Sequence, residues 1–119
     1  MADHRSTLLV VNPVLEERAD DFEQWLRSVV HAAMLVHQPA LVGRFTVLRA
    51  TEAADGIVPF AFLFDGGEPT DWELQPLLER ALGPEAAAEA MSDMTAMLRE
   101  EQYGWPVSRV RLDGPAVSA

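Results

Sequence analysis

Two histidines of the sequence are suited to act as a general base near neutral pH. His31 lies opposite the apolar stripe of an expected helix, which favours a solvated side chain over a catalytic one. His37 lies at the end of that helix, where a cation interacts favourably with the helix dipole, so a capping role is favoured. A helix end beside a strand can also border a pocket. Both residues therefore remain candidates for the base.

Arg44 is the candidate for binding an anion, because it is a charged residue within an otherwise apolar strand segment. The favoured role is protection of a sheet edge, or pairing with one of the 19 acidic residues. The alternative is a catalytic role, in which the guanidinium stabilises a carboxylate, enolate or phenolate.

Four further residues are candidates for contact with a substrate. An amide or an amphipathic ring can supply a hydrogen bond inside an apolar pocket, although a turn role for the amide and ordinary packing for the rings are favoured. They are Asn12, Trp25, Tyr103 and Trp105.

Several kinds of site are missing from the sequence. Without cysteine there is no thiol nucleophile and no thiolate metal site. His31 and His37 are too far apart to share one helix face as metal ligands. Asp65-Gly66-Gly67 lacks the lysine and the glycine spacing of a phosphate loop and indicates a turn. We therefore expect neither a metal nor a cofactor.

The composition predicts one acidic domain. Nine basic residues, all arginine, stand against 19 acidic ones and give a formal net charge of −10. This charge disfavours nucleic acid and anionic membrane surfaces as partners. The expected domain covers residues 7–112, and residues 1–6 and 113–119 are polar tails. No signal segment or membrane-spanning run is visible, so a cytoplasmic location is expected.

The hydrophobic patterns predict four strands and two helical segments. The expected strands are Thr7–Asn12, Leu41–Arg49, Ile57–Phe64 and Val107–Leu112. The first helix spans Glu16 to Val36. The second begins at a capping box of Thr70 and Glu73, breaks at Gly83-Pro84, and continues to about Gln102, with Gly104 as its cap.

The order of these elements is β-α-β-β-α-β, which is typical of an α+β, ferredoxin-like fold with a four-stranded antiparallel sheet. In that topology the first and third strands are central, and the predicted central strands carry no charge. The predicted edge strands do, with Arg44 and Arg49 on one and Arg109 and Arg111 on the other.

The two central strands are apolar on both faces, yet two helices cover only one face of such a sheet. The uncovered face would expose an apolar patch on the order of several hundred Å². A second copy packed sheet against sheet would cover it, so we expect a homodimer.

Three segments carry a resemblance to a known superfamily. They are Val11-Asn12-Pro13 at the end of the first strand, Asp21–Leu26 in the helix, and Pro39–Phe45 before the second strand. With them the sequence resembles the dimeric α/β-barrel proteins, including the antibiotic-biosynthesis monooxygenase (ABM) and EthD-like families, over Leu8 to Leu112. It departs from the family pattern in that the histidine after the tryptophan appears only at His31, and Ala40-Leu41 replaces a glycine.

The resemblance implies a cofactor-independent enzyme, a monooxygenase, cyclase or isomerase, acting on a hydrophobic, oxygenated aromatic or polyketide-like compound. The alternative hypothesis is a non-catalytic module for ligand binding or dimerisation. A pocket that holds a buried histidine with Arg44 within hydrogen-bonding reach would favour the enzyme. A gap between helices and sheet that is filled by apolar side chains, with no polar group inside, would exclude it.

Overall fold

A four-stranded antiparallel sheet in the order β2-β3-β1-β4 forms one layer of the protein. The computed structural model describes residues 7–66, 68–108, 110 and 112. The long central strands are β1 (Thr7–Leu15) and β3 (Ile57–Asp65), and the short edge strands are β2 (Phe45–Arg49) and β4 (Tyr103–Val107). The predicted topology and the central position of the two uncharged strands are thus confirmed.

The position of the last strand differs from the prediction. β4 is Tyr103–Val107, and in its pairing with β1 Trp105 lies opposite Leu9. Gly104, predicted to cap a helix, is a strand residue; a Cβ there would lie 2.5 Å from the carbonyl oxygen of Leu9. The prediction was wrong because the close approach of Gly104 to β1 places residue 104 in a strand. A local pattern of apolar residues does not reveal such a long-range contact. Arg109 and Arg111 lie outside the described residues.

Gly104→Ala is expected to lower the free energy of unfolding by about 1–3 kcal/mol, because the Cβ meets backbone that cannot move aside cheaply. Gly43→Ala is the matched control, since a Cβ at Gly43 has nothing within 4 Å and its φ is −72°. Urea unfolding measures both. Equal stability of the two variants would show that β4 does not pack this closely on β1.

The first helical segment is nearly continuous, as predicted for Glu16 to Val36. It comprises η1 (Glu16–Arg18), α1 (Ala19–Trp25), the wider π-type turns of η2 (Leu26–His31), and α2 (Ala32–His37). A short helix, α3 (Pro39–Val42), follows. The predicted strand start at Leu41 is therefore wrong. Proline at the first turn of α3 favours a helix there, and β2 begins at Phe45.

The second helical segment is broken at Gly83-Pro84, as predicted. It comprises η3 (Pro69–Trp72), α4 (Leu74–Leu82) and α5 (Pro84–Ala96), and Gly83 has a φ of +90°. Two details of the prediction were wrong. The first is the capping box, which consists of Glu68 and Asp71 and not of Thr70 and Glu73. The Asp71 Oδ2 accepts a hydrogen bond from the Glu68 N–H at 2.8 Å.

The other wrong detail is the end of α5, which lies at Ala96 and not near Gln102. Beyond Ala96 the backbone turns to the end of β1. The Leu15 N–H donates to the carbonyl of Met97 (2.9 Å), and the Arg99 N–H donates to that of Pro13 (2.8 Å). These long-range bonds take the place of further helical turns.

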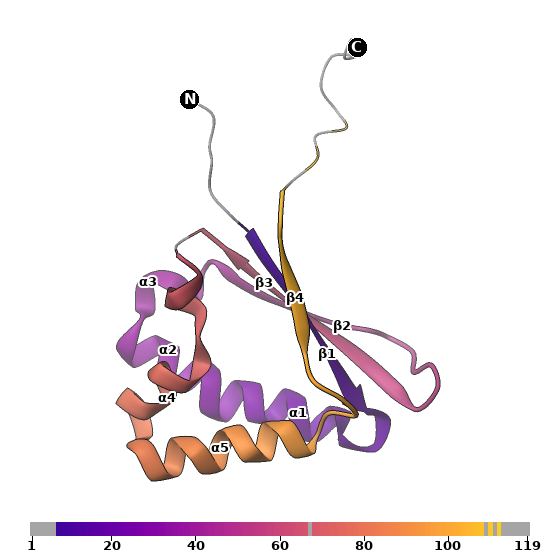
Figure 1. Cartoon of the computed structure of the whole chain (residues 1–119), viewed down its shortest axis with the longest axis horizontal. Helices are drawn as coiled ribbons and strands as arrows, with labels where there is room; N and C mark the ends of the chain where they lie inside the picture. The colour runs from indigo at the N-terminus through magenta and orange to yellow at the C-terminus, as the bar shows by residue number, and fades with distance from the viewer. Residues whose placement is uncertain (1–6, 67, 109, 111, 113–119) are drawn as a thin grey trace.

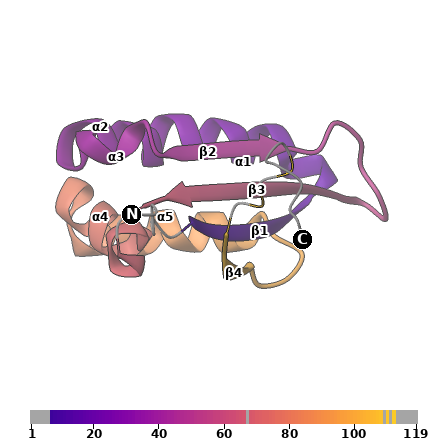
Figure 2. The same cartoon turned by 90° about the horizontal axis from the view of Figure 1, so that it is seen from above.

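All the helices lie on one face of the sheet (Figures 1 and 2). The core between the two layers centres on aromatic rings, with Phe22 of α1 packed against Phe60 and Phe62 of β3. No helix in the described ranges is long and apolar enough to cross a membrane.

The opposite face of the sheet, here called the outer face, is not covered by any described element of the chain (Figure 2). The strand registers place mostly apolar side chains on it. Among them are Leu9, Val11, Thr46, Leu48, Ala61, Leu63, Tyr103 and Trp105, and Thr7 and Asp65 are polar residues at the strand ends. Three large apolar side chains of this face are well exposed, Leu48 at 53%, Tyr103 at 46% and Trp105 at 51%. The predicted apolar character of both faces is confirmed.

Candidate functional site

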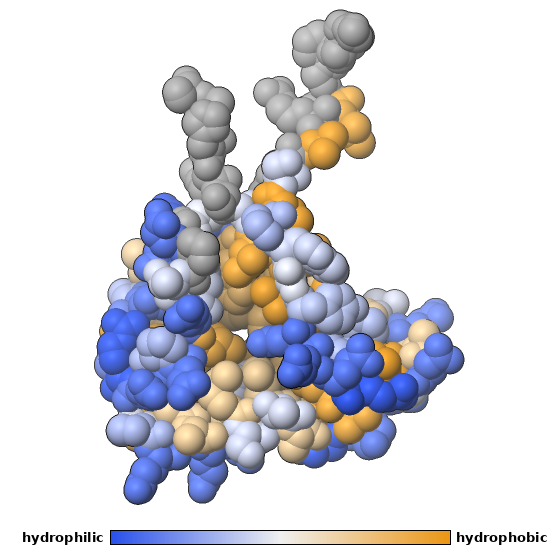
Figure 3. Space-filling model, viewed as in Figure 1, coloured by the Kyte–Doolittle hydropathy of each residue, from blue (hydrophilic) through white to orange (hydrophobic). Residues whose placement is uncertain are grey.

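A cavity of about 650 Å³, here called the central cavity, lies between the sheet and the second helical segment. Figure 3 shows the molecule hollowed there, with hydrophobic residues around the opening. The sheet supplies apolar side chains from β1 and β3, and η3, α4 and α5 supply the opposite wall. The lining residues are Leu8, Val10, Phe62, Phe64, Trp72, Glu73, Leu74, Gln75, Pro76, Glu79, Met91 and Gln102. The volume and the largely apolar wall are typical of small-molecule sites.

Two amide side chains form a polar contact at the β4 side of this cavity. Asn12 on β1 is fully buried, and its Nδ2 donates to the carbonyl of Phe60 at 3.2 Å. Gln102, in the loop before β4, lines the cavity and donates from Nε2 to Asn12 Oδ1 at 2.5 Å. Because Asn12 is held by its bond to the sheet, it restricts the orientation of the Gln102 amide at the cavity wall.

The helical wall carries the charged groups of the central cavity. Glu73 and Glu79 line it, and Gln75 Nε2 donates to Glu79 Oε2 at 3.3 Å. Trp72 is buried, and its Nε1 donates to the carbonyl of Gly66 at 2.7 Å. The centroid of its ring lies 4.8 Å from that of the Phe64 ring. The two carboxylates are the groups of this cavity that can accept a proton.

A second, smaller cavity of about 380 Å³ lies between the first helical segment and the edge strand β2, and we call it the lateral cavity. Its floor is apolar and its rim carries charged and polar side chains. The floor consists of Leu26, Met34, Val42, Phe45, Val47 and Phe60, and the rim of Glu23, Arg27, His31 and Arg49.

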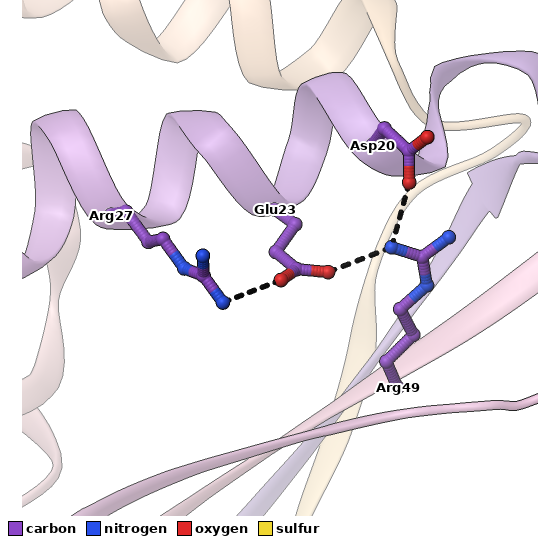
Figure 4. Close-up of polar contacts among 4 residues, drawn as sticks. All are labelled: Asp20, Glu23, Arg27 and Arg49. Carbon is purple, nitrogen blue, oxygen red and sulfur yellow. Dashed lines mark hydrogen bonds and ion pairs between the residues drawn. The ribbon is translucent and has the colours of Figure 1, made fainter.

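Glu23 joins two arginines across the rim of the lateral cavity (Figure 4). Its Oε2 accepts from Arg27 Nη2 at 2.6 Å, and its Oε1 accepts from Arg49 Nη1 at 2.7 Å. Arg49 also pairs with Asp20 at 3.0 Å and lies over the Phe60 ring, 5.5 Å from its centroid. The hydrogen bonds to Glu23 and then Asp20 raise the pKa of Arg49 above its ordinary value.

Comparison with known proteins adds one finding about the fold. No protein-family model matches the sequence, and no curated protein matches it either. Among solved structures, the chain matches a "putative antibiotic biosynthesis monooxygenase" from Caulobacter crescentus CB15 with a TM-score of 0.52. The match has 14% sequence identity and covers 90% of this chain and 91% of that one. The chain has an ABM-like, ferredoxin-like α+β fold. The likeness to EthD-like proteins stays a prediction.

The ABM-like fold separates the residues that the sequence nominated for catalysis. His31 lines the lateral cavity, and neither His37 nor Arg44 lines either cavity. His37 is an exposed residue at the end of α2, and Arg44 is an exposed residue in the turn before β2. The predicted set of His37, His31 and Arg44 is therefore not gathered in one place.

The residues nominated for substrate contact are also divided. Asn12 lies behind the wall of the central cavity and acts on it through Gln102. Trp25 is buried in the core, and its Nε1–H has no hydrogen-bond partner in the described part of the chain. Tyr103 and Trp105 lie on the outer face with their rings 5.4 Å apart. Their predicted contact with a ligand stays a prediction.

Sequence reasoning missed the charged and amide residues that line the central cavity, among them Glu73, Glu79 and Gln102. Gln102 was placed near the end of a helix, and Glu79 on a helix face shows no distinctive signal. Trp72 is an amphipathic ring near the start of a helical segment, and this position was the signal in the sequence for a pocket residue. Among residues 7–66, 68–108, 110 and 112, no group of three or more metal-ligating His, Asp or Glu side chains occurs.

Proposed function

We propose that this protein is a small-molecule enzyme that binds a hydrophobic, oxygenated aromatic or polyketide-like compound in the central cavity. The observation that carries the proposal is a cavity of about 650 Å³ that has apolar side chains on its sheet wall and the amide of Gln102, held by the buried Asn12, in its lining. Apolar walls bind the ring system, and a small number of polar groups orient its oxygens. The ABM-like fold supports a reaction of the monooxygenase, cyclase or isomerase kind, without a cofactor.

In this proposal Gln102 hydrogen-bonds a substrate oxygen, and Asn12 is a positioning residue that orients Gln102. Glu73 or Glu79 accepts the substrate proton, because neither His31 nor His37 lines the cavity. Removal of a proton from an electron-rich aromatic substrate produces an anion, and that anion is the species that reacts. The catalytic roles of His31, His37 and Arg44 stay predictions.

We also propose that the protein is a homodimer that packs through the outer face. Half of the sheet's side chains point to this face, and no described element of the chain covers them. Burial of apolar surface between two copies would stabilise the pair. A cytoplasmic location stays a prediction.

A non-catalytic ligand-binding module is the second candidate. The observation that favours it is that both carboxylates of the central cavity, Glu73 and Glu79, are exposed. An exposed carboxylate lacks the low-dielectric surroundings that make a strong general base. The experiment below separates the two functions.

Oxidation of 1,8-dihydroxyanthrone by O₂ tests the proposed enzyme. Loss of a C10 proton gives an anion that combines with O₂ and yields the anthraquinone and water, which is followed by absorbance and oxygen uptake. We expect wild-type protein to accelerate this reaction above the uncatalysed rate, and Gln102→Leu to lose about tenfold or more of the acceleration. Met91→Trp, which fills the cavity, is expected to abolish both binding and turnover.

Ala88→Trp provides the matched control, since it adds the same ring to the exposed side of α5. Binding without turnover would support the non-catalytic module instead. Absence of binding, or equal binding by Met91→Trp and Ala88→Trp, would overturn the assignment of this cavity as the ligand site.

A further inference from the structure

The lateral cavity is separate from the proposed active site, although β3 contributes side chains to both. Its lining comes from the first helical segment, α3, β2 and Phe60 of β3, whereas the central cavity is lined by β1, β3, the second helical segment and Gln102. Within the part of the chain that the structure describes, no residue lines both cavities. It also lies on the helix side of the sheet, because its lining residues Phe45, Val47 and Arg49 alternate with the outer-face residues of β2. A second copy on the outer face would leave it accessible.

The lining of the lateral cavity gathers two of the nine arginines of a chain with a net charge of −10. Besides Asp20, which pairs with Arg49 from outside the described lining, these two guanidinium groups face one carboxylate, that of Glu23. Both oxygens of that carboxylate are used, one by each arginine. Glu23 therefore occupies the position that a ligand anion would take between Arg27 and Arg49 (Figure 4).

The two arginines differ in how firmly they are held. Arg49 is fixed by Glu23, by Asp20 and by the Phe60 ring. The side chain of Arg27 is 69% exposed and bonds Glu23 through Nη2. A guanidinium has several N–H donors in a planar fork that matches a carboxylate. Arg27 can therefore turn from Glu23 to a ligand at little cost, since an exposed ion pair contributes about 0–1 kcal/mol.

The apolar floor determines which chemical groups the remainder of the ligand can carry. Beneath the charged rim lie two aromatic rings, Phe45 and Phe60, with aliphatic side chains around them. A volume of about 380 Å³ is at the lower end of the roughly 300–1,000 Å³ of small-molecule pockets. This space suits a compact apolar body such as a fused pair of aromatic rings.

We propose that the lateral cavity is a binding site for an apolar monocarboxylate, whose carboxylate pairs with Arg27 and Arg49 and whose body lies on Phe45 and Phe60. Glu23 is the resident counter-ion that the ligand displaces. His31, on the same rim, is the neighbouring hydrogen-bond donor and a reporter of occupancy.

Titration of the purified protein with 2-naphthoate tests the site, with 2-naphthamide as the neutral probe of the same shape. Calorimetry gives the affinity, and the imidazole resonances of His31, assigned with His31→Gln, report where the probe binds. We expect 2-naphthoate to bind at least about fivefold more tightly than 2-naphthamide, and to shift the His31 resonances.

Three substitutions make the test specific. Arg27→Gln is expected to weaken 2-naphthoate binding about five- to tenfold, and Arg80→Gln, at an exposed arginine of α4, is expected to leave it unchanged. Glu23→Gln is expected to tighten binding about two- to fivefold, because it removes the competing carboxylate. A gain in affinity cannot result from loss of folding.

Several results would overturn the proposal. One is the absence of saturable binding up to about 10 mM 2-naphthoate, which corresponds to about −3 kcal/mol. Another is unchanged or weaker binding in Glu23→Gln. Val47→Trp should fill the lateral cavity and abolish binding, and Met91→Trp should leave it intact. The reverse pattern would place the probe in the central cavity, and would overturn this inference without touching the proposed function.

Discussion

Phe22→Ala is expected to lower the free energy of unfolding by about 3–5 kcal/mol, because the ring is fully buried and its removal leaves a cavity. The Phe22 ring contacts Phe60 edge-on at 4.8 Å between centroids and stacks on Trp25 at 5.9 Å. It therefore joins the first helical segment to the central strand β3. Chemical denaturation followed by circular dichroism measures the loss.

Leu35→Ala is the control, since Leu35 of α2 is 52% exposed and its truncation should cost no more than about 0.5 kcal/mol. Comparable losses in the two variants would show that the aromatic cluster is not the centre of the core. The loss in Phe22→Ala is a large fraction of the roughly 5–15 kcal/mol that holds a domain of this kind folded.

Leu63→Arg is expected to convert the proposed dimer into monomers. Leu63 lies on the outer face of β3, directly opposite Leu9 on one side and Thr46 on the other. Symmetry places the new charge on both copies of a sheet-to-sheet interface, and an unpaired buried charge costs several kcal/mol. The dimer dissociation constant should rise by about 100-fold or more. Sedimentation at micromolar concentration measures the mass.

Ala88→Arg serves as the control, because it places the same charge on the exposed side of α5 and away from the outer face. Its mass should equal that of the wild type. Wild-type protein with the mass of a single chain would contradict the proposed dimer, and a folded Leu63→Arg variant of dimeric mass would place the interface elsewhere.

The sequence by itself determined the kind and order of the elements. The uncharged strands around Val10 and Phe62 are central, as their apolar character on both faces predicts, because only strands paired on both sides lose so much contact with water. The break at Gly83-Pro84 was equally visible, since proline begins a helix and glycine accepts a φ of +90°. These features depend on residues that are near one another in the chain.

Only the tertiary structure decided where the last strand lies and which side chains meet. β4 begins at Tyr103 because the backbone at Gly104 packs against Leu9, a contact between residues far apart in the chain. The same long-range pairing brings Gln102 to Asn12. His31 and Arg44, both nominated for catalysis from the sequence, do not line a common cavity. Residue types and periodicity define faces, whereas the register between distant strands defines the cavities, and no local pattern encodes that register.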